Sequence, residues 1–283
     1  MIWETKNGSR LSRLGQGTWK LGMSSSLAAK EVGALQRGFE LGLRIVDTAQ
    51  MYAEGQAERV VGMACAGCRD EVFITTKVWP SNGSREGIPR ALQASLERLK
   101  TDYVDLYLFH WPSKEYPMEE SMEGLVQCLD QGLTRHIGVS NFPVSLLKAA
   151  QAFAKNRLTV DQVEYSLTVR QAEATLIPYA AANQVALMAY SPLRHLVSAN
   201  LSTAARQALR TIAQRLGVTV QAVALAFILR QTSVDMVAIP KTANLAHLES
   251  NSKALGLKLT AEDEALLDAA FPRSPGDLQI ERY

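Results

Sequence analysis

Short apolar runs rich in β-branched and aromatic residues alternate along the chain with longer segments in which apolar residues recur every three or four positions. The short runs predict eight strands, at residues 14–17, 44–47, 72–77, 104–110, 136–139, 160–163, 185–190 and 236–239. Helical spacing is clearest in three sets of residues: Ala28, Val32, Leu35 and Phe39; Met118, Met122, Leu125 and Leu129; and Val220, Val223, Ala224 and Phe227. Strands that alternate with helices in this way indicate βα units and a parallel sheet.

Eight βα units in 283 residues predict an α/β fold of the (β/α)8 type, the TIM barrel, which typically needs roughly 250 residues. In front of it, Asn7-Gly8 lies between β-like residues 2–5 and 10–14 and predicts an N-terminal β-hairpin with a two-residue turn. A doubly wound dinucleotide-binding sheet is the alternative, but Lys20 stands where the third glycine of G-x-G-x-x-G belongs. No Pro/Gly/Ser-rich linker divides the chain, so we expect a single domain over residues 1–283.

Composition and charge limit the partners of this chain. Hydrophobic residues make up 47% of it, and 30 Lys and Arg against 28 Asp and Glu leave a net charge of +2. Because the positive residues are scattered, we expect a small-molecule partner and a monomer, with no nucleic acid and no membrane. No apolar stretch approaches a membrane span of about 20 residues, and residues 1–4 do not resemble a signal peptide, which predicts a cytoplasmic protein.

The cysteines and histidines do not form a pattern typical of a metal site. Cys65 and Cys68 form a lone C-x-x-C, which we interpret as structural thiols, with zinc or redox chemistry as the alternative. The four histidines include no H-x-H pair, so we predict no metal.

Polar residues follow each predicted strand, and in a barrel the carboxyl ends of the strands converge on one mouth. They are Thr18-Trp19, Asp47, Lys77, His110, Ser140-Asn141, Gln162, Tyr190-Ser191 and Lys241-Thr242. One interpretation is a structural ion pair of Asp47 with Lys77 beside a core histidine. The other is a site in which the Lys77 ammonium lowers the pKa of the Tyr52 phenol and His110 hydrogen-bonds a carbonyl oxygen.

Four segments resemble the aldo-keto reductase family, over residues 14–251 of this chain. They are Asp47-Thr48-Ala49 with Tyr52, Thr75-Thr76-Lys77, Leu106-Tyr107-Leu108-Phe109-His110-Trp111-Pro112 and Ile137-Gly138-Val139-Ser140-Asn141-Phe142. The resemblance implies that Asp47, Tyr52, Lys77 and His110 are a catalytic tetrad. It also implies NAD(P)H-dependent carbonyl reduction by hydride transfer, in which Tyr52 protonates the oxygen.

The same resemblance implies a nicotinamide site. Ser140, Asn141 and Gln162 are expected to hydrogen-bond the carboxamide, which needs both donors and acceptors, and Tyr190 to stack on the ring. The alternative for Gln162 and Tyr190 is that they are ordinary polar strand ends. The expected cofactor site further includes Gly17, Thr18, Asp47, Ser191 and Leu193.

Phosphate is expected at the other end of the cofactor, after the eighth strand. Lys241 and Thr242 offer an ammonium, a hydroxyl and backbone N–H groups at the start of a predicted helix. The family often has an arginine where this chain has His247, and a neutral imidazole binds phosphate more weakly than a guanidinium does. Asn251 matches the family's adenine-amide residue, while Ser250 replaces a common glutamate. NADP(H) is therefore favoured as cofactor, with NAD(H) as the alternative.

Three tryptophans follow strand ends and are expected to line the substrate site together with His110: Trp19, Trp79 and Trp111. The short segment 271–283 favours small aldehydes, ketones and dicarbonyls such as methylglyoxal over steroids. Two other functions remain open at this point. One is a nicotinamide-binding regulatory subunit with little turnover, and the other is a metal-dependent barrel hydrolase that uses His110, Asp47 and Lys77.

Overall fold

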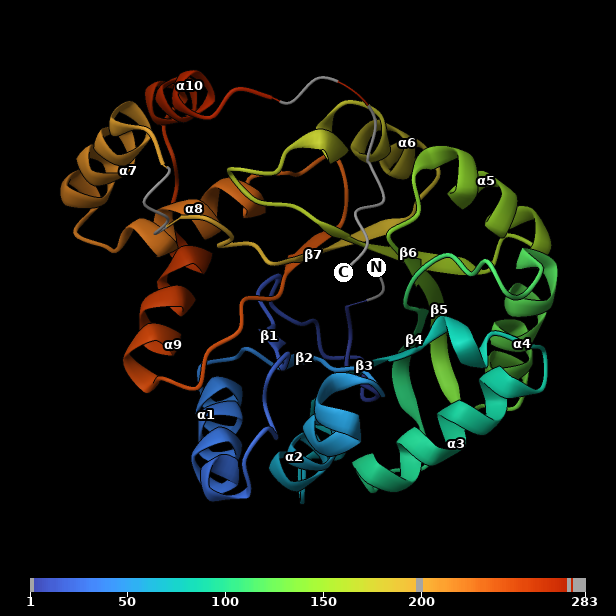
Figure 1. Cartoon of the computed structure of the whole chain (residues 1–283). Coiled ribbons are helices and arrows are strands. Elements are labelled where there is room, and N and C mark those ends of the chain that lie inside the picture. The colour runs from blue at the N-terminus through green and yellow to red at the C-terminus, as the bar shows by residue number, and fades with distance from the viewer. Residues whose placement is uncertain (1–2, 197–200, 274–275, 277–283) are drawn as a thin grey trace.

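The computed structural model describes residues 3–196, 201–273 and 276. At its centre, eight strands form one sheet in the order β1 to β8, and each strand is parallel to the next (Figure 1). The strands are β1 (Gln16–Gly17), β2 (Ile45–Asp47), β3 (Phe73–Val78), β4 (Val104–Phe109), β5 (Thr134–Ser140), β6 (Leu158–Glu164), β7 (Ala186–Tyr190) and β8 (Met236–Ala238). All eight predicted strands exist, with ends that differ by one or two residues.

The sheet closes on itself between its first and last strands. Leu14 forms a parallel bridge with Ala238, and the Gly15 amide donates to the Ala238 carbonyl oxygen at 2.8 Å. A Cβ on Gly15 would lie 2.8 Å from the Ile45 carbonyl oxygen, so this close approach requires glycine. The (β/α)8 barrel is thereby confirmed, and the doubly wound alternative is wrong.

Helices surround the barrel on the outside (Figure 1). The α-helices of the described residues are α1 (Ala28–Glu40), α2 (Gln56–Ala64), α3 (Gly87–Leu99), α4 (Met118–Asp130), α5 (Val144–Phe153), α6 (Leu176–Ala182), α7 (Thr203–Leu216), α8 (Val220–Leu229), α9 (Leu245–Ser252) and α10 (Ala261–Ala270). Short 3-10 segments are η1 (Ser25–Leu27), η2 (Tyr52–Gly55), η3 (Arg69–Glu71), η4 (Pro80–Asn82), η5 (Gln171–Glu173) and η6 (Lys253–Gly256). The predicted apolar faces are turned inward, as at Leu35 and Phe39 of α1.

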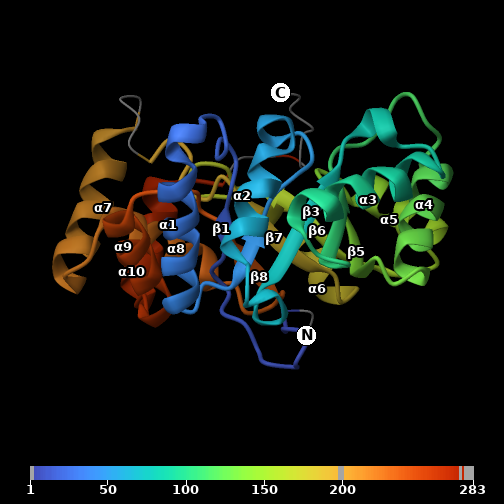
Figure 2. The same ribbon diagram turned by 90° about the horizontal axis from the view of Figure 1, so that it is seen from below.

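Two apolar layers hold this arrangement together. Inside the barrel, inward-facing side chains such as Phe73, Leu108 and Met188 fill the space between the strands. Trp3 and Leu11 belong to this cluster. The N-terminal segment that carries them lies at the bottom of the barrel in the view of Figure 2. A larger cluster lies between the outer face of the sheet and the helices. Because both faces of each strand are buried, the strands read as continuous apolar runs in the sequence.

The N-terminal hairpin is present, but its predicted two-residue turn is wrong. Glu4 and Arg10 form an antiparallel bridge, and the Thr5 amide donates to the Ser9 carbonyl oxygen at 2.9 Å, which leaves a three-residue loop. Only Gly8 in this loop has a positive φ, of 79°. A two-residue type I′ turn needs a positive φ at both central residues, whereas a three-residue loop needs it only at its last. Residue 2 of the predicted hairpin lies outside the described residues.

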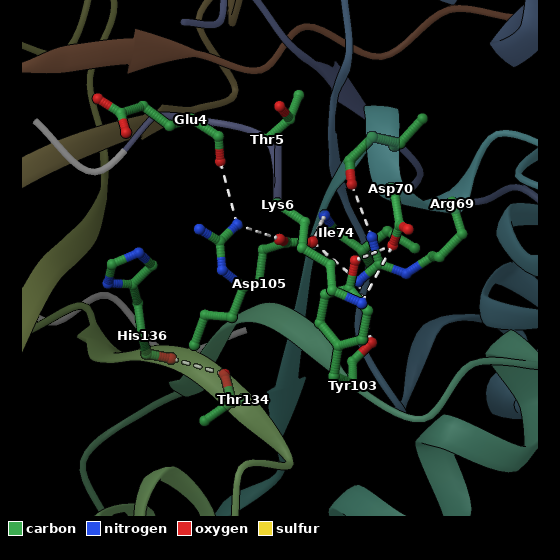
Figure 3. Close-up of polar contacts among 12 residues, drawn as sticks. Glu4, Thr5, Lys6, Arg69, Asp70, Ile74, Tyr103, Asp105, Thr134 and His136 are labelled. Atoms are coloured by element: carbon green, nitrogen blue, oxygen red, sulfur yellow. Dashed lines mark hydrogen bonds and ion pairs between the residues drawn. The ribbon is translucent and has the colours of Figure 1, made fainter. Parts of the chain in front are cut away.

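A polar cluster centred on Asp105 ties the hairpin to the amino end of the barrel (Figure 3). The buried Asp105 carboxylate accepts from Arg69 at 2.8 Å, from the Ile74 amide at 2.9 Å and from Arg135 at 2.9 Å. Arg135 also donates to the Glu4 carbonyl oxygen at 3.2 Å. Both carboxylate oxygens therefore have strong donors, and we call this set the amino-end cluster.

The cysteines are free thiols. Cys65 is buried and Cys68 is half-buried, and burial raises the pKa of Cys65 to about 12. A thiol that stays protonated at neutral pH is a poor nucleophile and a poor metal ligand. Among the side chains that the structure describes, no group of three or more His, Cys, Asp and Glu residues is placed to hold a metal ion.

Over residues 3–196 and 201–273, no single helix is both long and apolar enough to cross a membrane. Within these ranges, one pair of helices, α7 and α8, meets the length and composition criteria when taken together, and the two are bent by 93°.

Candidate active site

The carboxyl ends of β2 and β3 bring a buried ion pair to the mouth of the barrel. Lys77 lies near the end of β3 with its side chain directed inward, and it is fully buried. Its Nζ donates to Asp47 Oδ2 at 2.7 Å and to the Thr48 carbonyl oxygen at 2.8 Å. The ammonium is thus held by the end of the neighbouring strand.

Tyr52 and His110 complete the group of four. The Lys77 Nζ lies 3.3 Å from the Tyr52 hydroxyl, and the Tyr52 and His110 rings meet edge to face with centroids 5.8 Å apart. Trp79 also packs edge to face on His110, with ring centroids 5.3 Å apart. The structure therefore brings together the four residues predicted as catalytic, although they come from different segments of the chain.

Tyr52 stands at the start of an unusual turn, η2. Ala53 (φ 48°, ψ 43°) and Glu54 (φ 55°, ψ 38°) are left-handed, and Gly55 has a φ of 84°. Left-handed backbone costs about 1–2 kcal/mol for each residue that is not glycine. Strain of this kind persists only where the surroundings impose it, and it concentrates at functional sites.

The ion pair is shielded from water. Burial raises the pKa of Asp47 and lowers the pKa of Lys77, while the contact between the two groups opposes both shifts. Gln162 Nε2 donates to the second Asp47 oxygen at 2.7 Å, so this carboxylate has no remaining oxygen without a donor. Asp47 is therefore fixed, and it fixes Lys77 in turn.

Burial also sets the protonation of the other two groups. Burial, and then the negative charge of Asp47, raise the pKa of Tyr52 well above its ordinary value. This direction is opposite to the lowering expected from Lys77, because removal from water is the largest cause. The pKa of His110 is well below its ordinary value, because of burial and the nearby Lys77 charge. At neutral pH the site thus holds a protonated phenol beside a neutral imidazole.

His110 also keeps unused hydrogen-bonding capacity. Its Nδ1 is buried and has no hydrogen-bond partner within the described part of the chain. Its backbone is fixed from both sides, because the His110 amide donates to Val78 and the Asn141 side chain donates to the His110 carbonyl oxygen at 3.2 Å. The ring is thus rigidly placed at the mouth.

Polar side chains at the ends of β5, β6 and β7 form a connected row next to this group. Ser140 Oγ donates to the Gln162 carbonyl oxygen at 2.8 Å, and Asn141 Nδ2 donates to Ser140 Oγ at 3.0 Å. The Tyr190 hydroxyl donates to Asn141 Oδ1 at 2.9 Å. Asn141 has a φ of 65°, which asparagine tolerates better than most residues.

A pocket of about 340 Å³ continues along the rim from this row toward β8. Its lining residues are Trp19, Ser191, Pro192, Leu193, Arg194, Pro240 and Lys241. Gly17 and Thr18, at the end of β1, directly precede the lining residue Trp19, and the Thr18 hydroxyl donates to the Asp47 carbonyl oxygen at 2.9 Å.

The residues predicted for the phosphate and adenine end follow β8. Lys241 and His247 are exposed, Thr242 is half-buried, and Asn251 is buried in α9. Asn244 caps α9 by accepting from the Ala246 amide at 2.9 Å. These residues lie along the β8–α9 segment and do not contact the group of four, as expected of the two ends of one long ligand.

A dinucleotide fits this row of residues. At one end, Ser140, Asn141 and Gln162 supply the mixture of amide donors and acceptors that a carboxamide needs. At the other end, Lys241 supplies an exposed ammonium of the kind that binds phosphate. The pocket between them is open to such a ligand.

Sequence reasoning missed two charged pairs, Arg194 with Glu164 and Arg98 with Glu58. Arg194 makes a bidentate contact with Glu164 at 2.7 and 2.6 Å. The fully buried Glu58 pairs with Arg98 at 2.5 Å. A signal existed for Glu58, because it lies on the buried face of α2, where a charged residue needs a partner.

Trp19 and Trp111 complete the predicted set. Trp19 is 53% exposed at the pocket, and Trp111 is half-buried directly after His110.

Known proteins resemble this chain over nearly its whole length. The profile of the Aldo/keto reductase family matches residues 13–271. Methylglyoxal reductase YeaE of Escherichia coli (strain K12) is 38% identical over 272 residues, which cover 96% of this chain and 95% of that protein. Two solved structures are also similar. An aldo/keto reductase from Klebsiella pneumoniae in complex with NADP and acetate has a TM-score of 0.89 at 34% identity, with 95% of each chain covered. The thermostable aldo-keto reductase Tm1743 in complex with epalrestat has a TM-score of 0.87 at 38% identity, covering 94% of this chain and 98% of that chain.

The fold and the site thus define a barrel oxidoreductase that acts on carbonyl groups. The chain belongs to the aldo/keto reductase family. The predicted family and reaction class are confirmed, and the metal-dependent hydrolase alternative is wrong.

Proposed function

We propose that this protein reduces small aldehydes, ketones and dicarbonyls, with methylglyoxal as the first substrate to test, and that Tyr52 is its general acid. One observation carries the assignment: the Lys77 ammonium contacts both Asp47 and the Tyr52 hydroxyl, beside the His110 ring. The similarity to methylglyoxal reductase YeaE supports the substrate class. NADP(H) is the cofactor, in keeping with the NADP and NADPH complexes of similar structures.

The chain's own groups divide the work as follows. A bound reduced nicotinamide supplies the hydride that the carbonyl carbon receives. The Tyr52 hydroxyl donates its proton to the carbonyl oxygen, and the Lys77 ammonium stabilises the negative charge left on the phenol. Asp47 holds Lys77 in place. His110, whose imidazole is neutral at neutral pH, donates a hydrogen bond that orients the carbonyl oxygen of the substrate.

We assign the cofactor contacts from the positions along the rim. Ser140, Asn141 and Gln162 hold the carboxamide, and Tyr190 supports the ring. The remaining cofactor residues are Gly17, Thr18, Asp47, Ser191, Leu193, Lys241, Thr242, His247 and Asn251. Lys241 and Thr242 receive phosphate, and the exposed His247 gives a weaker contact there than an arginine would.

Aromatic side chains define the substrate end. Trp79 packs on His110, while Trp19 and Trp111 flank the same mouth. Large rings of this kind bury apolar area with little loss of conformational freedom. A small carbonyl compound enclosed by them would lie within reach of Tyr52. We further propose that the protein works as a cytoplasmic monomer without a nucleic-acid or membrane partner.

The experiment is a steady-state assay of NADPH consumption with methylglyoxal and a panel of small aldehydes, ketones and sugars, repeated with NADH. We expect turnover with dicarbonyls and a higher kcat/KM for NADPH. Tight NADPH binding by folded protein without turnover on any substrate would instead indicate a nicotinamide-binding regulatory subunit.

A further inference from the structure

A second ion pair, between Arg98 and Glu58, packs against the turn that carries Tyr52. The Cβ that an alanine would have at Gly55 lies 2.6 Å from Arg98 Cδ and 2.7 Å from Arg98 Nε, so the Arg98 side chain lies directly against the turn. Arg98 is not free to move away, because its Nε donates to Glu58 at 2.5 Å and its Nη2 donates to Ser95 at 3.0 Å. Gly55, the last of the left-handed residues after Tyr52, therefore lies against an Arg98 side chain that is held in place.

The same ion pair also contacts the strand that carries Lys77. The Thr76 hydroxyl donates to the second Glu58 oxygen at 2.6 Å. Because side chains alternate along a strand, Thr76 points outward to α2 while Lys77 points into the barrel. Glu58 is fully buried, so its carboxylate is committed to these two partners.

These contacts form a closed ring through the structure. It runs from Tyr52 along the turn to Gly55, through Arg98 and Glu58 to Thr76, and then along β3 to Lys77, whose ammonium lies 3.3 Å from the Tyr52 hydroxyl. Gly62 allows α2 to lie close to the end of α3, because a Cβ at this position would lie 2.6 Å from the Leu99 carbonyl oxygen.

We propose that Glu58 and Arg98 are positioning residues for Tyr52: together they hold the strained turn so that the phenol stays at hydrogen-bonding distance from the Lys77 ammonium. This inference rests on the proposed role of Tyr52 as proton donor. Proton transfer depends steeply on the distance between donor and acceptor, and a misplacement of about 1 Å can cost up to roughly 100-fold in rate.

An electrostatic effect adds to this geometry. The charge of Glu58 acts with Asp47 to keep Lys77 protonated, against the lowering of the Lys77 pKa by burial. Loss of the Glu58 charge is therefore expected both to loosen the turn and to lower the pKa of Lys77 further.

The chain provides a matched control pair in the amino-end cluster. Arg98 is 21% exposed and Glu58 fully buried, while Arg69 is 17% exposed and Asp105 fully buried. Both carboxylates also accept a hydrogen bond from β3, Glu58 from the Thr76 hydroxyl and Asp105 from the Ile74 amide. The amino-end cluster (Figure 3) lies near the start of β4, whereas Tyr52 lies at the carboxyl ends of the strands. Asp105→Asn thus reports what the loss of a buried ion pair does through stability alone.

The test compares Glu58→Gln, Thr76→Val, Asp105→Asn, Tyr52→Phe and the unmodified protein. Each is measured for the melting temperature, the NADPH Kd, kcat with methylglyoxal per folded molecule, and the solvent deuterium isotope effect on kcat. For Glu58→Gln we expect kcat to fall roughly tenfold, a larger isotope effect, and an NADPH Kd within about twofold of the unmodified value. Thr76→Val, which keeps the side-chain shape, should change kcat in the same direction by a smaller factor.

The outcomes separate this inference from the proposed function. If Tyr52→Phe retains full turnover, the proposed role of Tyr52 fails and this inference fails with it. If Tyr52→Phe is inactive but Glu58→Gln keeps kcat within about twofold, the inference alone is overturned. It is also overturned if Asp105→Asn loses kcat and raises the isotope effect as much as Glu58→Gln does. Should Glu58→Gln not fold, Thr76→Val against Asp105→Asn decides in the same way.

Discussion

The two ends of the barrel each bury an aspartate, and they use it differently. At the amino end, Asp105 is saturated by two arginines and the Ile74 amide. At the carboxyl end, Asp47 is saturated as well, but the groups around it are not: His110 Nδ1 has no partner in the described structure, and the Tyr52 hydroxyl meets only Lys77 at 3.3 Å. A buried charge by itself therefore does not indicate a reactive site. A reactive site is indicated when unused hydrogen-bond donors and acceptors lie beside the buried charge.

A third buried aspartate sharpens the contrast. Asp161 in β6 is fully buried, and neither of its oxygens has a hydrogen-bond partner within the described residues, although the Phe142 amide faces it. Burial raises the pKa of Asp161 well above its ordinary value, so the group avoids its charge instead of pairing it. Asp47 is thus a paired carboxylate whose neighbours keep unused hydrogen-bonding groups. Asp105 belongs to a closed structural cluster, and Asp161 is a buried acid without an ionic partner.

The largest effect is expected at the carboxyl end from Lys77→Met. The methionine keeps most of the side-chain volume but leaves Asp47 without its cation, which should cost about 3–5 kcal/mol of stability. Turnover should fall by at least about 100-fold, because the charge left on Tyr52 loses its partner. Denaturant unfolding and the methylglyoxal assay measure the two losses. Undiminished turnover in folded protein would show that Lys77 is only structural.

At the amino end of the barrel, Asp105→Asn should lower the stability of the protein without lowering its rate of turnover. It removes the charge facing Arg69 and Arg135, which are both partly exposed, so we expect a loss of about 2–3 kcal/mol, below the range for a fully buried pair. The rate per folded molecule should not change. Thermal unfolding and kcat measured on the same preparation check this, and a parallel fall in kcat would contradict the separation of the two ends.

Asp161→Asn should stabilise the protein at neutral pH by about 1–2 kcal/mol. The ordinary pKa of Asp161 is 3.8 and the folded one is higher, so the carboxyl favours folding at low pH and loses this contribution as the pH rises above 3.8. The melting-temperature difference between variant and unmodified protein should therefore be largest at neutral pH and shrink toward pH 4. A variant that is less stable at neutral pH would show that the carboxyl is paired and ionised.

The smallest effect is expected at the phosphate end, where the groups are exposed. His247→Arg should tighten NADPH binding by roughly fivefold, as an exposed charge pair allows, and leave NADH binding unchanged. Fluorescence titration with both cofactors measures it. Equal tightening of NADH would place the 2′-phosphate elsewhere.

Much of this arrangement could be predicted from the sequence, because strand ends in a parallel barrel are marked by where apolar runs stop. Asp47, Lys77 and His110 each end such a run, and the barrel brings those ends to one mouth. The predicted and observed strand boundaries differ by one or two residues, because a pattern of burial does not specify where strand pairing stops.

Other features could not be read from the pattern. Ala53 and Glu54 have no intrinsic preference for left-handed backbone, and the local sequence does not show that the Arg98 side chain packs against Gly55. The direction of the Tyr52 pKa shift also cannot be predicted, because the sequence places an ammonium nearby but does not show how completely the phenol is removed from water. Both depend on contacts between distant segments.

The most direct test of the account is the turnover of Tyr52→Phe. This change removes one hydroxyl and keeps the ring, so the fold and the NADPH Kd should be preserved. Methylglyoxal reduction by the variant should be at least about 100-fold slower than by the unmodified protein under the same conditions. Near-normal turnover by folded, NADPH-binding Tyr52→Phe would contradict the account, since the proton would then come from another group.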